Sequence, residues 1–315
     1  MQLSRQSRIA SHLFSMFMAV ALSSVSLCAA SIETGYTIRA SASEVRLAFA
    51  ASDRQGHIVN TLRSSDIAVV DNGSIIRQFL SFRPASESPL DLVILLDASE
   101  SVASQIPAEI AEIKRFFADS AWGDRTKVSI IAFGGLTPQL LCARDCNGKA
   151  AQLKLNTLRA DGDTPLYDAL FQAAEVLKES RYPESRPAMI LFSDGLDSVS
   201  MHSALDAAQA AQNLQAAIYA VNSRSAQAAP GNGDAVLGYL AASTGGLKFK
   251  LGQDVSAVLR MVLDDLQRGY VLTYMLPTQS VGQHSLQILP RSDPKLKFRS
   301  RRGYSVEPAP KRNEP

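Results

Sequence analysis

The chain has 315 residues, of which 46% are hydrophobic and 20% are charged, and its formal net charge is +2. This length and apolar content predict one medium domain with a smaller one, and they exclude a disordered or fibrous protein. The near-zero charge gives no global electrostatic argument for a nucleic-acid partner.

The first thirty residues differ from the rest of the chain. Arg5 and Arg8 precede the run LFSMFMAVALSSVSLCAA, and no acidic residue occurs before Glu33. This pattern predicts a signal peptide over residues 1–30, cleaved after Ala30, and an exported protein, periplasmic or extracellular, with no membrane insertion after cleavage. The alternative is an uncleaved membrane anchor, for which the run is near the lower length limit.

Cysteine usage agrees with export. Once the signal is removed, only Cys142 and Cys146 remain, in the stretch CARDC. An even count in an oxidising compartment predicts a short-loop disulfide, with two free thiols as the alternative. A zinc site has little support because no histidine lies nearby to complete four ligands.

Residues 31–85 are predicted to form an amino-terminal β segment. The stretches EVRLAFAASD, HIVNTL and DIAVVDNGSIIRQFLSF alternate in polarity and are separated by turn residues, with a tight turn expected at residues 71–73. The polar, proline-containing stretch RPASESPL marks the boundary with the next region.

In residues 91–276, short apolar runs alternate with segments whose apolar residues recur at helical spacing. The runs LVILL, KVSIIAF, AMILFS and AAIYAVN are continuous, as expected of strands covered on both faces. Apolar residues recur at helical spacing between them, at Val102, Ile106, Ile110, Ile113 and Phe117 and again at Leu166, Leu170, Ala174 and Leu177. This alternation predicts an open, doubly wound α/β fold with a mostly parallel sheet.

The sequence returns to a β pattern after Gly269, in YVLTYML, HSLQIL and LKFRSRRGYSV. We expect these strands to continue the α/β sheet and then, over residues 277–306, to pair with the amino-terminal β segment in one small sandwich. Residues 307–315 are polar and proline-rich and are predicted to be a disordered tail.

Oxygen-bearing side chains follow the first apolar run of the α/β region. Asp97, Ser99 and Ser101 alternate at what would be the carboxyl end of a parallel strand, facing solvent, where open sheets bind ligands. One carboxylate and two hydroxyls suit Mg²⁺ or Ca²⁺, but they are too few to complete the coordination shell.

Two later connections supply further oxygens. Thr164 precedes Pro165 and a helical pattern in DGDTPLYDAL, and Asp194 ends an apolar run in MILFSDGLD. Because hydroxyls dominate this shell, a bound dication would keep excess positive charge and an open position for an anionic ligand.

These three pieces together resemble the metal-ion-dependent adhesion site of von Willebrand factor type A domains. Asp97, Ser99 and Ser101 match that family's D-x-S-x-S, Thr164 its lone threonine, and Asp194 the aspartate of its S-D-G strand end. The resemblance implies a Rossmann-like domain that binds Mg²⁺, or Ca²⁺ or Mn²⁺, and through it an Asp or Glu carboxylate of a protein partner.

The chain departs from this family at two positions, with Glu100 and Asp163 where glycine is common. With Asp161 and Asp197 they form a set of possible accessory acids near the metal. Extra acids could raise metal affinity, supply a second cation position or repel an acidic ligand; the alternative is that they face solvent.

The flanking β segments resemble an exported subfamily called von Willebrand factor A-related, which is common in Acidobacteria. In it, β segments bracket the type A domain, so the resemblance covers nearly all of the mature chain.

The function expected from this reading is cation-dependent protein binding, with no catalytic residues. Two alternatives stay open: a structural component of an envelope assembly whose metal stabilises the fold, and a metal-dependent phosphoester hydrolase. The sequence has no G-x-S-x-G motif, and His12, His57, His202 and His284 lie in separate segments; His202 is the one expected near the site.

Overall fold

The computed structural model of the chain describes residues 44–118, 125–146, 149–179, 184–224, 232–250, 254–276 and 281–306. All of them belong to one compact unit, Ala42–Pro315. The predicted signal peptide with its cleavage site after Ala30, residues 31–43 of the predicted β segment, and the tail 307–315 lie outside the described residues.

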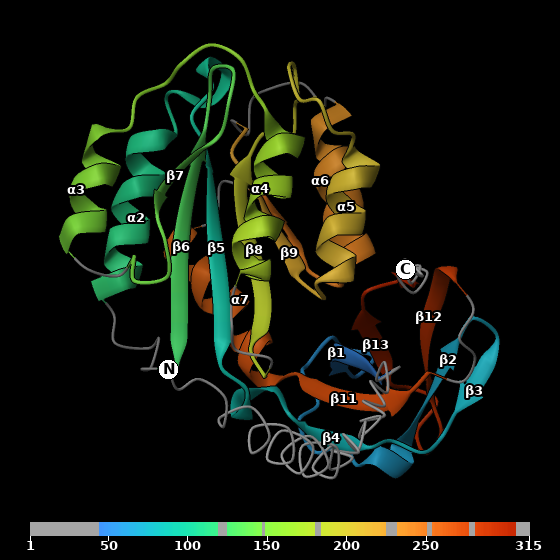
Figure 1. Ribbon diagram of the computed structural model, residues 1–315. Coiled ribbons are helices and arrows are strands. Elements are labelled where there is room, and N and C mark those ends of the chain that lie inside the picture. The colour runs from blue at the N-terminus through green and yellow to red at the C-terminus, as the bar shows by residue number, and fades with distance from the viewer. Residues whose placement is uncertain are drawn as a thin grey trace, which may run out of the picture. The chain divides into compact units, whose positions relative to one another are not determined.

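A six-stranded sheet forms the centre of the α/β region, in the order β10-β9-β8-β5-β6-β7 (Figure 1). Its strands are β5 (Leu90–Asp97), β6 (Thr126–Phe133), β7 (Gln139–Cys142), β8 (Arg186–Ser193), β9 (Ala217–Asn222) and β10 (Lys248–Lys250). The strands pair in parallel except β7, which runs antiparallel along the edge beside β6. Every residue of β5 is buried, which explains why its apolar run is continuous.

Helices cover both faces of this sheet, as the doubly wound prediction requires (Figure 1). One face packs against α2 (Ile106–Ala118), α3 (Lys149–Thr157) and α7 (Val255–Arg268), and the other against α4 (Leu166–Lys178), α5 (Ala204–Asn213) and α6 (Asn232–Thr244). Along β5, Leu92 and Ile94 enter the first core and Val93 and Leu95 the second, as the two-residue period of a strand dictates.

The first predicted helix starts later than its apolar spacing suggested. Val102 belongs to a short 3₁₀ turn, η3 (Glu100–Val102), and α2 begins at Ile106. The backbone N–H of Gln105 donates to the carbonyl of Val102, so the chain makes a tight turn here before the helix starts.

Both flanks of the α/β region together build a sandwich of two four-stranded sheets. One sheet has the order β13-β1-β11-β4 and the other β14-β12-β2-β3. These strands are β1 (Glu44–Ser52), β2 (Ile67–Asp71), β3 (Ser74–Ile76), β4 (Ser81–Pro84), β11 (Tyr270–Met275), β12 (Gly282–Pro290), β13 (Lys297–Ser300) and β14 (Gly303–Val306), with 3₁₀ turns η1 (Ser64–Asp66) and η2 (Ala85–Glu87) between them. Side chains from both sheets share one apolar core, so the expectation of a joint sandwich is confirmed.

The predicted tight turn connects β2 with β3. Asn72 and Gly73 have φ angles of 46° and 86°, which is the left-handed pair that a two-residue hairpin turn of type I′ needs. Asparagine and glycine tolerate these angles best, so this short sequence determines the hairpin locally.

Strand β11 does not continue the α/β sheet as the sequence led us to expect. It pairs antiparallel with β1 and with β4, so the parallel architecture ends with α7 and not at residue 276. Its first three residues are all buried, as in the strands of the α/β sheet, and only the pairing with β1, far away in sequence, reveals where it belongs.

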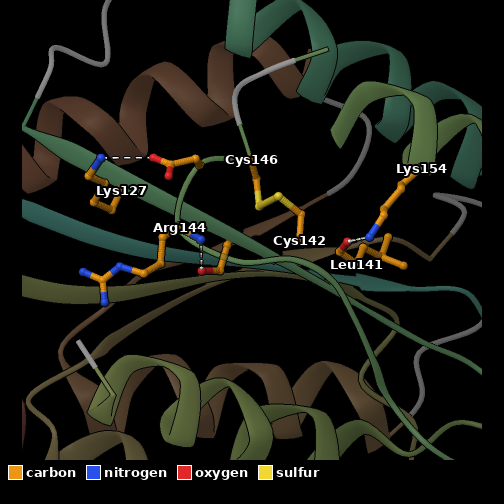
Figure 2. Close-up of a disulfide and its surroundings, with 8 residues drawn as sticks. Lys127, Leu141, Cys142, Arg144, Cys146 and Lys154 are labelled. Carbon is orange, nitrogen blue, oxygen red and sulfur yellow. Dashed lines mark hydrogen bonds and ion pairs between the residues drawn. A yellow bond between two sulfur atoms is a disulfide. The ribbon is translucent and has the colours of Figure 1, made fainter. Parts of the chain in front are cut away.

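Cys142 and Cys146 form the predicted disulfide (Figure 2). The bond joins Cys142, at the end of β7, to Cys146, which is fully buried in the core on the face of the sheet that α2, α3 and α7 cover. Around it, the Arg144 backbone N–H donates to the Ser129 hydroxyl and Lys154 donates to the Leu141 carbonyl (Figure 2). The disulfide therefore holds the antiparallel edge strand against the sheet.

Candidate metal centre

Three loops meet at the carboxyl edge of the six-stranded sheet. They follow β5, precede α4 and follow β8. The backbone N–H of Asp161 donates to the carbonyl of Ala98 at 2.8 Å, and that of Ser198 donates to the carbonyl of Thr164 at 3.0 Å. These bonds bring the segments carrying the predicted ligands to one edge.

Asp97 is the last residue of β5 and is completely buried. Its Oδ1 accepts hydrogen bonds from the backbone N–H of Ser99 at 2.9 Å and from the Ser99 hydroxyl at 2.6 Å. Its Oδ2 accepts from the Ser193 hydroxyl at 2.6 Å. The expectation that Asp97 faces solvent is therefore wrong, because the adjoining loops fold over the strand end and cover it.

Burial raises the pKa of Asp97 to about 6, against the lowering effect of its hydrogen bonds from Ser193 and Ser99, and the charge of Asp194 raises it further. Asp194 ends the neighbouring strand and is only 4% exposed. Among the described residues, no lysine, arginine or histidine forms an ion pair with either carboxylate. Two buried acids without a cationic side chain are the environment that a bound cation would stabilise.

Hydroxyl groups complete the donor set. Ser99 Oγ and Ser101 Oγ lie 3.1 Å apart, and Thr164 is buried in the loop before α4. Asp194 keeps its orientation by accepting a hydrogen bond from the Leu196 backbone N–H at 3.0 Å. All these donors are hard oxygens, which fits Mg²⁺, Ca²⁺ or Mn²⁺ and not a soft metal.

Within the described part of the chain, no group of three or more His, Cys, Asp or Glu side chains is placed to hold a metal by itself. A cation at this edge would therefore depend on the serine and threonine hydroxyls as well as on the two aspartates.

The accessory acids have other surroundings. Glu100, Asp161 and Asp163 are exposed, and Asp163 Oδ1 accepts a hydrogen bond from the Ser198 hydroxyl at 3.2 Å. Asp197 Oδ1 accepts from the Ser200 hydroxyl at 2.5 Å and from the Tyr167 backbone N–H at 3.3 Å, in the first turn of α4. Asp163 and Asp197 thus stabilise the loops, and the exposed side chains of Glu100 and Asp161 agree with the solvent-facing alternative.

Sequence reasoning missed Ser193 and Ser198. Ser193 orients Asp97 across the sheet, and the Ser198 hydroxyl accepts a hydrogen bond from the Thr164 backbone N–H at 2.9 Å. The signal for Ser193 was present, since a polar residue directly precedes the aspartate that ends a buried strand. Ser198 lies in a polar loop and carries no such signal.

Gly195 is required by the backbone of this loop. Its φ angle is +81°, and a Cβ at this position would lie 2.2 Å from the carbonyl oxygen of Gly233 in α6. A side chain here would push the loop that carries Asp194 away from the helix, so the glycine fixes the position of that carboxylate.

His202 contacts an acid outside the predicted ligand set. Its Nδ1 lies 2.7 Å from Asp168 Oδ1, and its ring stacks on Phe171 at a centroid distance of 4.0 Å. The backbone N–H groups of Met201 and His202 also donate to Asp168. This pair anchors the loop after β8 to α4.

Residues 92–196 match the family model described as von Willebrand factor type A domain. This part of the α/β region is therefore similar to a von Willebrand factor type A domain. All five predicted ligands, Asp97, Ser99, Ser101, Thr164 and Asp194, lie within the matched residues. No curated protein matches the sequence.

Several solved structures are similar to the chain. The conserved hypothetical protein BatB from Bacteroides thetaiotaomicron is 18% identical, with a TM-score of 0.44, over 56% of this chain and 96% of that one. An aerotolerance-related membrane protein from Bacteroides fragilis is 19% identical, with a TM-score of 0.43, over 56% and 98%. The SpRpn10 VWA domain is 14% identical, with a TM-score of 0.40, over 55% and 95%.

Proposed function

We propose that the type A domain binds a protein partner through a divalent cation held at the carboxyl edge of its sheet. The observation that carries this proposal is the pair of buried carboxylates, Asp97 and Asp194, beside serine hydroxyls and without a cationic side chain. Burying such charges is costly unless a cation compensates them.

In this proposal each residue has a defined task. Ser99, Ser101 and Thr164 present hydroxyl oxygens, Asp97 and Asp194 supply the negative charge, and the Ser193 hydroxyl orients Asp97. Once bound, the cation would offer an open coordination position to a carboxylate oxygen of the partner's Asp or Glu. The site would then be a metal-ion-dependent adhesion site that takes Mg²⁺, Ca²⁺ or Mn²⁺.

We also propose that the protein is exported and belongs to the von Willebrand factor A-related subfamily. The disulfide between Cys142 and Cys146 supports an oxidising compartment, and sheets from both flanks bracket the type A domain. Across the described ranges, none of the helices is both long and apolar enough to traverse a membrane.

The metal is tested first, by calorimetry with Mn²⁺ or Mg²⁺. Asp97→Asn should weaken metal binding at least about tenfold, because it removes a buried charge of the donor set while keeping the shape of the side chain. Glu100→Gln is the matched control, since it removes one exposed charge from the same loop and should leave metal affinity within about threefold. Equal metal affinity in Asp97→Asn and the unchanged protein would contradict the proposal.

Partner binding is tested separately, by capture from envelope extract in Mg²⁺ and in chelator. A partner retained in Mg²⁺, released by chelator and lost with Asp97→Asn supports adhesion. Thr164→Ala should weaken partner binding more than metal binding, and metal and partner should raise each other's affinity by the same factor. The contrary result has two parts: the metal raises the unfolding temperature, but the same proteins are captured in Mg²⁺ and in chelator. That result would indicate a structural metal and exclude adhesion.

A further inference from the structure

A second polar cluster lies at the opposite edge of the six-stranded sheet, where β8 and β9 begin. A partly open cavity of about 60 Å³ lies there and is lined by residues of both the α/β region and the sandwich. Its polar lining comes from both sides: Arg46, Arg299 and Arg301 from the sandwich segments, and Arg186, Tyr219 and Asp265 from the α/β region.

The charges around this cavity are unbalanced. Four arginines line it, and among the described lining residues Asp265 is the single carboxylate. Asp265 is already engaged, because it forms an ion pair with Arg299 and accepts a hydrogen bond from the Tyr219 hydroxyl at 2.5 Å. Neither Arg186 nor Arg301 forms an ion pair with a carboxylate of another described residue that lines the cavity.

The two most deeply buried arginines bind mainly neutral carbonyl groups. Arg186 is 7% exposed and donates to the Leu266 carbonyl, while Arg301 is 6% exposed and donates to the carbonyls of Gln212 and Arg46. The Nε atoms of both Arg186 and Arg301 are buried without a hydrogen-bond partner among the described residues. A buried charged donor left unsatisfied is costly, so each Nε lacks an acceptor that a ligand could supply.

Burial lowers the pKa of Arg186 to about 10, and the charge of Arg46 acts in the same direction against the opposing effect of Tyr219 and Asp265. Burial likewise lowers the pKa of Arg301 to about 10, against the opposing effect of Tyr274, Tyr304 and Asp71. Both guanidinium groups stay charged at neutral pH, so two positive charges lie buried beside the cavity.

We propose that this cavity binds a small inorganic oxyanion of the size of phosphate or sulfate. Its volume of about 60 Å³ has room for a few water molecules or one such ion. The planar fork of a guanidinium group matches the paired oxygens of an oxyanion better than it matches a spherical halide. Because the arginines come from both the sandwich and the α/β region, the ion would link the two.

The test uses the mature chain and inorganic phosphate as the probe, with sulfate and chloride as parallel arms at constant ionic strength. Calorimetry should show phosphate and sulfate binding at one site, and the same ions should raise the unfolding temperature in proportion to occupancy. Chloride should give no saturable heat. Absence of saturable phosphate binding, or equal binding of chloride, would overturn the proposal.

Two variants should shift the affinity for phosphate in opposite directions. Asp265→Asn removes the negative charge at the cavity and should tighten phosphate binding roughly tenfold, whereas Arg186→Gln should weaken it by a similar factor. Arg125→Gln is the control, because this exposed arginine donates to the Glu87 carbonyl outside the cavity and should leave the affinity unchanged. If Arg186→Gln does not fold, Asp265→Asn still decides, since an unchanged or weaker affinity in that variant contradicts an anion site.

Discussion

Glu109 is an acid buried on α2, close enough to the candidate metal centre for the charge of Asp97 to act on it. It is 2% exposed, and the Ser223 hydroxyl donates to its Oε1 at 2.5 Å. Burial raises the pKa of Glu109 from its ordinary 4.5 to about 7, against the lowering effect of the Ser223 hydrogen bond, and the charge of Asp97 adds to the increase. The folded protein therefore holds a proton here that the unfolded chain releases at lower pH.

The sign of the resulting stability change follows from linkage. Between pH 4.5 and about 7 the native state binds more protons at Glu109 than the unfolded state, so its contribution to the free energy of unfolding falls as pH rises through this range. Glu109→Gln keeps the hydrogen bond from Ser223 and removes the charge. In chelator at pH 8 we expect it to be more stable than the unchanged protein by about 2 kcal/mol, and nearly equal at pH 4.5.

Urea unfolding at these two pH values measures the difference. The exposed Glu175→Gln serves as the control and should give no pH-dependent gain, because its side chain forms only a surface pair with Lys178. A Glu109→Gln protein that is destabilised at pH 8 would show that the buried group is ionised and favourably solvated in the fold.

Part of the geometry of the candidate site could be predicted from the sequence, and part could not. That Asp97 and Asp194 lie at one edge was predictable, because the parallel strands β5 and β8 both end there. The burial of Asp97 was not predictable, because it depends on loop 161–164 folding back over β5 through the Asp161 to Ala98 hydrogen bond. A contact between segments so far apart leaves no local trace in the sequence.

Among the helices and strands, those with long apolar runs or a clear helical period were predicted correctly, and the short edge strands were not. The apolar runs became β5, β6, β8 and β9, and the helical spacing from Leu166 to Leu177 became α4. The edge strands β7 and β10 were missed, because QLLC is half-exposed and KFK has three residues, too few to show a period. Strand β11 was recognised as a strand, but its partner strands are selected by tertiary pairing.

The disulfide at the end of the edge strand β7 is expected to stabilise the folded protein. The bond between Cys142 and Cys146 closes a very short loop, so its effect on the unfolded chain should be at the low end, about 2 kcal/mol. Replacing both cysteines with alanine should lower the free energy of unfolding by about this amount, and reduction of the unchanged protein should have the same effect. Denaturant titration measures both, and labelling of the unfolded, unreduced mature protein should find no free thiol; two reactive sulfurs would contradict the disulfide.

For the whole molecule, the notable feature is that two distant segments share one core. A buried polar network joins them: Asp71 on β2 accepts hydrogen bonds from the hydroxyls of Tyr274 on β11 and Tyr304 on β14, each at 2.7 Å. His284 Nδ1 on β12 lies 2.8 Å from the other oxygen of Asp71. Burial and the Asp71 carboxylate raise the pKa of Tyr274, so the tyrosine remains a donor at any physiological pH.

This network predicts that the two flanks of the α/β region gain and lose structure together. Asp71→Asn removes the buried charge and replaces one carboxylate oxygen, a hydrogen-bond acceptor, with an amide nitrogen, a donor. That nitrogen would face groups that donate to the carboxylate in the unchanged protein. The free energy of unfolding should therefore fall by about 3 kcal/mol. Tyr304→Phe is the matched control, since it removes one hydrogen bond at nearly constant volume and should cost about 1 kcal/mol.

Hydrogen exchange followed by mass spectrometry would show the extent of the change. In Asp71→Asn, amide protons of β1 and β2 should exchange faster by the same factor as those of β12 and β14, because both sheets enclose one core. The six-stranded sheet has its own two cores, so amides of β5 and β8 should keep most of their protection. Faster exchange in the amino-terminal strands alone would show that the two flanks are stable independently and that the network does not couple them.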